Sequence, residues 1–363
     1  MINRFRSFLW FLSLIPLYAQ ADSLDIKIGQ MLIVGMQGTS VNESSSIIQD
    51  IRSGIVGNVL LFEYNLNPTN TEKNLNILTQ KLQAAAGIPL FISIDQEGGQ
   101  VNRLKTKYGF EAMPSAKSVS DKKDTAYTRS IAHTIAKAIQ RCGINLNFAP
   151  VVDVYNPLCP VLGKRNRCFS SDPDIITEMA SVYIHEHHQA GIFTALKHFP
   201  GHGNSLSDSH LGLTDVSRVW KNEELDPYRN LIHDSLVDLI MSAHIINRKL
   251  DYDALPATLS KKIITDLLRG ELNYQGVVVS DDMQMHAISS YYGLEESVRL
   301  AITAGVDMLI FSNNIKGASQ YAPENIHRVI KTLVLNGSIP PARIDESFRR
   351  IMILKQKLSD RSK

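Results

Sequence analysis

The sequence predicts an α/β fold, a single TIM-type (β/α)8 barrel with long loops between strands and helices. Short apolar runs rich in β-branched residues alternate with amphipathic segments, a pattern typical of a parallel sheet. We count eight such runs. Several lead directly into ionisable residues, and the active site of such a barrel lies at the carboxyl ends of its strands. A doubly wound open sheet is the alternative, but the count of eight and the position of the polar residues favour the barrel.

The predicted elements extend over the whole chain after its first residues. The strands are expected at Met31–Met36, Val56–Phe62, Pro89–Ile94, Ile144–Val152, Phe193–His198, Leu239–His244, Gly276–Ser280 and Val306–Phe311. Helices are expected between them, among others at Glu72–Ala86, Thr125–Arg141, Pro173–Ala190, Lys261–Arg269 and Glu295–Ala304. No boundary between domains is visible, so we predict that residues 22–363 form one catalytic domain.

The first residues have the pattern of an export signal. Arg4 and Arg6 precede the apolar run Phe8–Leu17, and Ala19-Gln20-Ala21 follows it. This three-part pattern predicts a signal peptide, residues 1–21, cleaved after Ala21. The alternative is a buried N-terminal helix. We therefore expect an exported protein, periplasmic or secreted, without stable membrane insertion, because the run is short for a bilayer span.

Composition narrows the possible partners. The chain is 44% hydrophobic and 20% charged, with a formal net charge of +2. These values are typical of a soluble globular protein, and no basic run suggests a nucleic-acid partner. Cys142, Cys159 and Cys168 are the three cysteines. A Cys159–Cys168 disulfide and free buried thiols are both open, whereas metal-ligand spacing is absent. We expect a monomer with no metal and no cofactor.

One loop after a predicted strand is rich in histidine. Lys197-His198-Phe199-Pro200-Gly201-His202-Gly203 is followed, after four residues, by Asp208-Ser209-His210. In an extended segment, residues two apart face the same side, so Asp208 can hold one tautomer of His210 and raise its basicity. Such a histidine can donate and accept a proton near neutral pH. A His-rich surface loop and a metal site are the alternative interpretations.

Acids and arginines elsewhere complete the candidate site. Asp281 and Asp282 end an apolar run, and only one of two adjacent strand residues can face the barrel axis. A carboxylate there could attack an anomeric carbon, while the other makes structural hydrogen bonds or caps a helix. Asp95 could accept hydrogen bonds from sugar hydroxyls, and Arg103 and Arg167 could bind hydroxyls or an amide carbonyl. The alternative for both arginines is a surface ion pair.

At this point the sequence resembles the family-3 glycoside hydrolases, and specifically the single-domain bacterial β-N-acetylhexosaminidases. Lys197 to His210 matches every position of that group's Lys-His-Phe/Ile-Pro-Gly-His/Leu-Gly, four residues, Asp-Ser/Thr-His pattern. Further matches are Ile94 to Gly99, Ala149 to Asp153, Arg167 to Ser170, Pro256 to Ser260 and Ser280 to Met283. The resemblance extends from about Ile28 to the end of the chain.

The resemblance implies a role for each candidate residue. Asp281 aligns with the nucleophile, His210 with the acid/base and Asp208 with its partner. Residues that hold the sugar align with Asp95, Arg103, Arg167, Lys197 and His198. Arg165 competes with Arg167 for the arginine position, and Cys168 stands where the family usually has Ser. Strict strand alternation does not place adjacent Lys197 and His198 on the same side.

The implied activity is that of a retaining exo-glycosidase. It would hydrolyse terminal β-linked N-acetylglucosamine from carbohydrate partners, with peptidoglycan fragments as the expected source. Phosphorolysis is an alternative, because histidine repels an anionic acceptor less than a carboxylate does. A β-glucosidase-type family-3 hydrolase usually brings its acid/base from a second domain. A catalytically silent sugar binder would be expected to lack one of the residues Asp281, Asp208 and His210.

Overall fold

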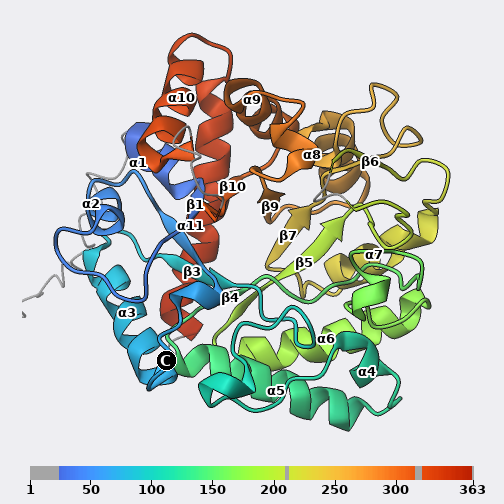
Figure 1. The fold of residues 1–363 in the computed structure, drawn as a ribbon. Helices are drawn as coiled ribbons and strands as arrows, with labels where there is room; N and C mark the ends of the chain where they lie inside the picture. Colours follow the sequence, from blue (N-terminus) through green and yellow to red (C-terminus); the bar gives the residue numbers. More distant parts are fainter. Residues whose placement is uncertain (1–23, 209–211, 315–320, 362–363) are drawn as a thin grey trace, which may run out of the picture.

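The chain folds into a closed barrel of eight parallel strands with helices around it (Figure 1). The computed structural model describes residues 24–208, 212–314 and 321–361. Around the barrel the strands follow the order β1-β10-β9-β7-β5-β4-β3-β2, and β1 closes the ring by pairing with both β10 and β2. The predicted TIM-type barrel is therefore confirmed, and the open sheet is excluded.

Each of the eight predicted apolar runs overlaps one barrel strand, and two of the strands extend past the predicted end. The strands are β1 (Leu32–Gly35), β2 (Asn58–Leu61), β3 (Phe91–Ile94), β4 (Leu146–Asn147), β5 (Phe193–Phe199), β7 (Leu239–Ser242), β9 (Val277–Asp282) and β10 (Met308–Phe311). Nearly all of their residues are buried, because a barrel covers both faces of its sheet, and this explains the continuous apolar runs. A separate two-stranded sheet, which the sequence did not predict, pairs β6 (Thr214–Asp215) with β8 (Ile245–Ile246).

Helices surround the barrel on its outer side (Figure 1). The α-helices are α1 (Leu24–Gln30), α2 (Ser46–Arg52), α3 (Thr71–Ala85), α4 (Ala116–Ser120), α5 (Thr125–Arg141), α6 (Pro173–Gln189), α7 (Asp226–His233), α8 (His286–Ser289), α9 (Leu294–Ala304), α10 (Pro323–Leu335) and α11 (Pro341–Arg361). Short 3-10 turns are η1 (Glu63–Asn65), η2 (Thr106–Tyr108), η3 (Gly163–Arg165), η4 (Asn222–Leu225) and η5 (Ala257–Leu259). The predicted helix Lys261–Arg269 is a wider π-type helix, η6 (Lys262–Glu271).

Local sequence explains where the two longest central helices begin. Asp124 precedes α5, and its side chain accepts hydrogen bonds from the backbone N–H groups of Ala126 and Tyr127. Asp172 precedes α6 and accepts from Asp174 N, with Pro173 at the first helical position. Both arrangements satisfy N–H groups that have no partner inside a helix. None of the helices in the described part of the chain is long and apolar enough to cross a membrane.

The two ends of the barrel differ in what they hold. At the amino ends of the strands, buried Lys355 of α11 donates to Gln30 Oε1 at 2.6 Å and to the carbonyl of Gly57 at 2.9 Å. Its ammonium also lies over the ring of Phe91, the first residue of β3. Helix α11 therefore contacts the amino ends of β1, β2 and β3. The opposite end, where the strands finish, carries the pocket described below.

Candidate active site

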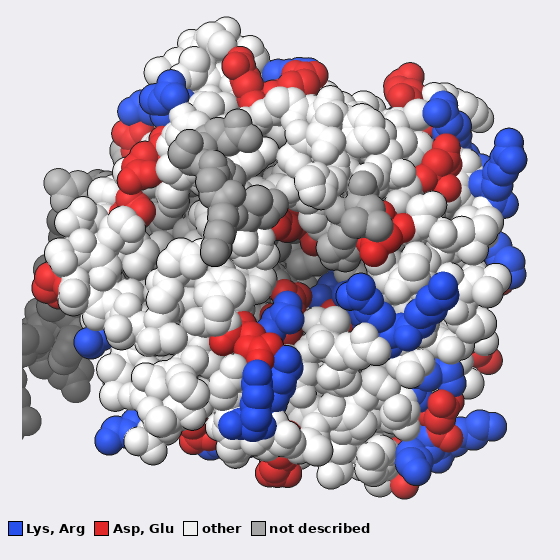
Figure 2. All heavy atoms as spheres, viewed as in Figure 1, with Lys and Arg blue, Asp and Glu red and all other residues white. Residues whose placement is uncertain are grey.

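A pocket of about 290 Å³ opens where the barrel strands finish. Figure 2 shows it as a hollow with side chains of both charges facing it. Six of the eight site residues predicted from the sequence line this pocket: Asp95, Arg103, Arg167, Lys197, His198 and Asp281. They come from the ends of different strands and from loops beside them, as is usual for the mouth of a TIM barrel.

Asp95 follows β3 and lies between two cations. Its Oδ1 accepts a hydrogen bond from Lys197 Nζ at 2.9 Å, and its Oδ2 lies 3.6 Å from Arg103 Nη2. The backbone N–H of Arg103 donates to buried Gln96 Oε1 at 2.9 Å, which fixes the loop that carries Arg103. A carboxylate has about four lone-pair positions. Asp95 therefore keeps acceptor capacity toward the pocket that two sugar hydroxyls could use.

Glu97 lies next to this group and binds Lys197 as well as a further predicted cation, Arg167. Arg167 donates from Nε and Nη2 to both Glu97 oxygens, each at 2.8 Å. Lys197 Nζ lies 2.7 Å from Glu97 Oε1. Burial opposes the charge on Glu97, but the neighbouring Arg167 and Lys197 outweigh it and lower its pKa. Burial likewise opposes the charge of Lys197, yet Glu97 and Asp95 raise its pKa.

His198 and Lys197 both line the pocket although they are adjacent on β5. The register of β5 against β7 shifts between Leu196 and Phe199, and such an irregularity ends the strict alternation of side chains. The peptide bond between Lys197 and His198 is cis. The alternation expected from the sequence was therefore wrong at this position.

Buried Asp153 fixes the orientation of His198. Asp153 Oδ2 lies 2.7 Å from His198 Nδ1 and accepts the backbone N–H of His198 at 3.1 Å, while Oδ1 accepts that of His202 at 2.7 Å. Burial opposes the charge of Asp153, but His198 and His202 outweigh it and lower its pKa. These bonds fix the imidazole ring of His198, and its Nε2 lies 3.4 Å from Arg167 Nη2.

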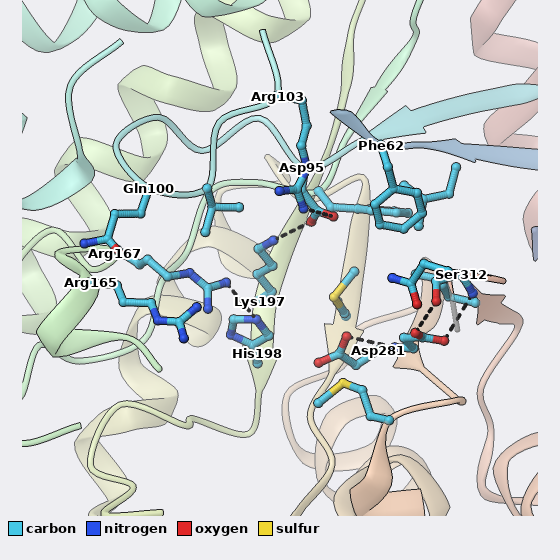
Figure 3. A pocket seen from close by; sticks show the side chains of 18 residues that line it. Phe62, Asp95, Gln100, Arg103, Arg165, Arg167, Lys197, His198, Asp281 and Ser312 are labelled. Carbon is cyan, nitrogen blue, oxygen red and sulfur yellow. Dashed lines mark hydrogen bonds and ion pairs between the residues drawn. The ribbon is translucent and has the colours of Figure 1, made fainter. Parts of the chain in front are cut away.

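The two adjacent acids at the end of β9 have different surroundings. Asp282 accepts hydrogen bonds from the Ser312 hydroxyl at 2.5 Å and from Gln284 N at 3.1 Å. The bond to Ser312 ties β9 to the end of β10, and burial raises the pKa of Asp282 to about 6. Asp281 accepts the backbone N–H of Asp282 at 2.8 Å. In Figure 3 its side chain points into the space that faces His198.

The base of the His-rich loop is held by a buried carboxyl group. Glu224 of η4 accepts from Gly203 N at 3.2 Å and from Asn204 Nδ2 at 3.0 Å. Burial raises the pKa of Glu224 to about 7. Asp208 is half-buried near the end of this part of the loop and is not among the pocket-lining residues. The predicted acid/base His210 lies outside the described residues.

The structure separates the two candidate arginines by their surroundings. Both Arg165 and Arg167 line the pocket (Figure 3). Arg167 has a side chain only 10% exposed and is held by Glu97, whereas Arg165 is exposed on η3. Arg167 also donates to the carbonyl of Val161 at 3.1 Å, so its guanidinium has a fixed direction. This geometry favours Arg167 as the arginine that holds the sugar, and the role stays a prediction.

Cys159 and Cys168 are free thiols in this structure, as is Cys142. Both belong to a small buried cluster with Val151, Val161 and Leu162, behind the loop that carries Arg167. The sequence left open a Cys159–Cys168 disulfide or free buried thiols, and the structure has free thiols. Among the described residues, no group of three His, Cys, Asp or Glu side chains is arranged to hold a metal ion.

Three residues of this site received no role from the sequence. Glu97 and Asp153 follow predicted strands, and that position was the signal that could have identified them. Their partners, however, lie far away in the sequence, and such pairings are not visible in a single sequence. Glu224 precedes a helix and lies far from any predicted strand end, so nothing in the sequence marked it as part of the site.

The fold places a cluster of acids and cations at the carboxyl ends of the barrel strands, where the active sites of barrel enzymes lie. Residues 23–354 match the model of the "Glycosyl hydrolase family 3 N terminal domain". The chain belongs to this family, and the resemblance found in the sequence is confirmed.

Individual relatives give the same classification. A protein named "Beta-hexosaminidase A" from Pseudoalteromonas piscicida is 35% identical in an alignment of 334 residues that covers 85% of this chain and 54% of that protein. A "Beta-hexosaminidase" from Alkalilimnicola ehrlichii is 33% identical over 83% of this chain and 84% of its own length. The solved structure of a "glycoside hydrolase family 3 beta-N-acetylglucosaminidase" from Paenibacillus sp. str. FPU-7 superimposes with a TM-score of 0.85 and 34% identity, over 93% of this chain and 63% of that one. The chain thus spans about half to two thirds of two of these relatives.

Proposed function

We propose that this family-3 glycoside hydrolase is an exo-enzyme that releases terminal β-linked N-acetylglucosamine. The observation that carries the proposal is the pocket in which Asp281 faces the cluster of Asp95, Lys197 and Arg167. The relatives named above add support, because they are called β-hexosaminidases or a β-N-acetylglucosaminidase. Both names describe enzymes for sugars of this class.

Asp281 is the nucleophile in the proposed mechanism. Its carboxylate oxygen attacks the anomeric carbon and forms a covalent glycosyl-enzyme, while His210, supported by Asp208, gives a proton to the departing glycosidic oxygen. His210 then takes a proton from water, the water oxygen attacks the anomeric carbon, and the bond to Asp281 breaks. Two inversions retain the β configuration.

The remaining side chains position the sugar. Asp95 accepts hydrogen bonds from hydroxyls, and the remaining N–H groups of Lys197, Arg103 and Arg167 donate to hydroxyl or amide oxygens. The pocket wall is also partly apolar, and the residues that make it so are Leu60, Phe62, Phe148, Met241, Met285 and Ile310. Such a surface suits the C–H faces of a pyranose ring and the methyl of an acetamido group.

The setting of the enzyme is part of the proposal. We propose residues 1–21 as an export signal and residues 22–363 as a single catalytic domain that acts as a monomer. An exported enzyme meets fragments of the peptidoglycan wall, and we propose these fragments as its carbohydrate substrate. Detection of the chain in periplasm or medium, with its new N-terminus at Asp22, would support export, and recovery of intact chain from the cytoplasm would contradict it.

The test compares two chromogenic substrates that differ only in the 2-substituent. The wild-type chain should turn over the β-N-acetylglucosaminide far faster than the β-glucoside. Asp281→Asn should lower kcat by about a thousand-fold or more, since it removes the nucleophile. Asp282→Asn is the matched control. It should be less stable than wild type because the hydrogen bond from Ser312 is weakened, but it should keep measurable turnover.

Two further readouts separate the mechanisms. Proton NMR of the first-formed sugar should show the β anomer, and azide should restore turnover to Asp281→Ala by forming a glycosyl azide. Activity on the glucoside alone, or equal loss in both asparagine variants, would refute the assignment. Formation of sugar 1-phosphate in phosphate buffer would instead support the phosphorolytic alternative.

A further inference from the structure

Glu97 lies beneath the pocket, between two cations that are proposed to hold the sugar. Its Oε1 accepts from both Lys197 Nζ, at 2.7 Å, and Arg167 Nη2, at 2.8 Å, and its Oε2 accepts from Arg167 Nε at 2.8 Å. Its side chain is 4% exposed and is not among the pocket-lining residues. Glu97 is therefore placed to act on a substrate through these cations without touching it.

The chain fixes Glu97 with a tight turn directly after β3. The backbone N–H of Glu97 donates to the carbonyl of Val101 at 2.9 Å, across a turn made by Gly98 and Gly99. Gly98 has φ +95° and Gly99 has φ +59°, conformations that residues with a Cβ rarely adopt. The turn fixes the backbone position from which the Glu97 carboxylate reaches both cations.

Counting donors shows what this arrangement leaves for a ligand. An ammonium group has three N–H donors, and Lys197 uses two of them on Asp95 and Glu97 among the described residues. Arg167 has five, of which three bind Glu97 and the carbonyl of Val161, and Nη2 also lies 3.4 Å from His198 Nε2. The remaining donors have directions set by the bonds already made, and both groups border the pocket.

We propose that Glu97 is a positioning residue for the substrate: its carboxylate directs the unused N–H groups of Arg167 and Lys197 toward the sugar. The inference rests on the proposed function. Burial alone would lower the pKa of Lys197, and the neighbouring carboxylates reverse that effect, Glu97 first among them. Without Glu97, Lys197 should lose its proton at a lower pH and with it one charge that holds the sugar.

The other charged groups that line the pocket with Lys197 stay unchanged in this test. They are Asp95 and Arg103 from the segment after β3, Arg165 and Arg167 from the loop before α6, His198 on the same strand, and Asp281 and Asp282 from β9. Of these, Asp95 alone gives Lys197 a second carboxylate partner within hydrogen-bond distance. A change in the alkaline pH dependence on replacing Glu97 therefore reports the loss of that one carboxylate.

The experiment measures kcat and KM of the full-length chain on a chromogenic β-N-acetylglucosaminide between pH 5 and pH 10. Glu97→Gln should raise KM about ten-fold or more and change kcat less, because binding shared by ground state and transition state is lost. Its alkaline limb of kcat/KM should move to lower pH. Glu97→Asp keeps the charge but shortens the side chain, so its limb should stay near that of wild type while KM rises less.

Glu186→Gln is the matched control. Glu186 is also 4% exposed and also bound to two basic side chains, Arg129 and His133, but it lies between α5 and α6. This variant should keep the wild-type KM and pH profile, which separates positioning from the general loss of a buried ion pair. Thermal unfolding identifies any variant that fails to fold, and Glu97→Asp then carries the test.

The outcomes distinguish this inference from the proposed function. A wild-type chain inactive on the N-acetylglucosaminide would overturn the proposed function. An active wild type whose Glu97→Gln variant has unchanged KM, or an unmoved alkaline limb, would overturn the role of Glu97 alone. If Glu97→Gln does not fold and Glu97→Asp does, a wild-type KM for Glu97→Asp would also overturn the positioning role of Glu97.

Discussion

Replacing Glu224 with glutamine should change the stability of the protein by an amount that depends on pH. Glu224 is 1% exposed and accepts hydrogen bonds from Gly203 N and Asn204 Nδ2 at the base of the His-rich loop. Burial raises its pKa from the ordinary 4.5 to about 7. At neutral pH and above, the folded chain must therefore hold a buried charge that the unfolded chain exposes to water.

The expected size follows from that difference. One pKa unit corresponds to about 1.4 kcal/mol, so the rise to about 7 corresponds to about 3 kcal/mol of folding stability. Because the folded pKa is raised, this contribution is fully present below pH 4.5 and is lost as pH rises through about 7. Glutamine does not titrate, but it turns one acceptor into a donor, which costs about 1–3 kcal/mol at every pH.

Urea unfolding of wild type and Glu224→Gln at pH 5 and at pH 8.5 measures the effect. The variant should be the less stable protein at pH 5, and its deficit should shrink or reverse by about 3 kcal/mol at pH 8.5. Glu223→Gln is the control, since Glu223 is 43% exposed and should show no such trend. A stability difference for Glu224→Gln that is the same at both pH values would refute the reasoning.

Two further predictions each compare a pair of matched substitutions. Arg167→Lys should lower kcat/KM about 100-fold, because lysine cannot replace the two hydrogen bonds of Arg167 to Glu97. The matched variant of exposed Arg165, Arg165→Lys, should keep kcat/KM within about three-fold of wild type. The opposite ranking in steady-state kinetics would move the sugar-binding role to Arg165. Gly98→Ala should cost about 3 kcal/mol, since φ is +95° and the new Cβ would lie 2.4 Å from a backbone oxygen. Gly109→Ala has a similar φ of +88° but open space, so it should cost about 1 kcal/mol in urea unfolding, and equal losses would exclude the clash.

The barrel could be predicted because its strands are buried on both faces. A strand such as β9 begins with Val277-Val278-Val279, and this continuous apolar run is the pattern that a parallel sheet requires. The site position was equally visible, because Asp95, Lys197 and Asp281 each stand at the end of such a run. Local sequence carries this information, since each signal lies within one strand and its next few residues.

The pairing of side chains could not be predicted in the same way. Glu97 binds Arg167 and Lys197, which come from a different loop and a different strand. Which carboxylate reaches which cation depends on loop paths that no local pattern encodes. The common orientation of Lys197 and His198 was missed for a related reason, because a register shift in β5 depends on the neighbouring strand β7.

The contrast between Asp281 and Asp282 shows how the fold gives two identical side chains different chemistry. A nucleophile must be an anion, and two adjacent carboxylates disfavour each other's charge. Burial raises the pKa of Asp282 to about 6, and the Ser312 hydroxyl occupies one of its oxygens, so Asp282 is committed to structure. Asp281 also lines the pocket, and its side chain points into the space that faces His198 (Figure 3). The two acids therefore differ in the hydrogen bonds that hold them, which makes Asp282→Asn the control for loss of a carboxylate at this strand end and Asp281→Asn the test of the nucleophile.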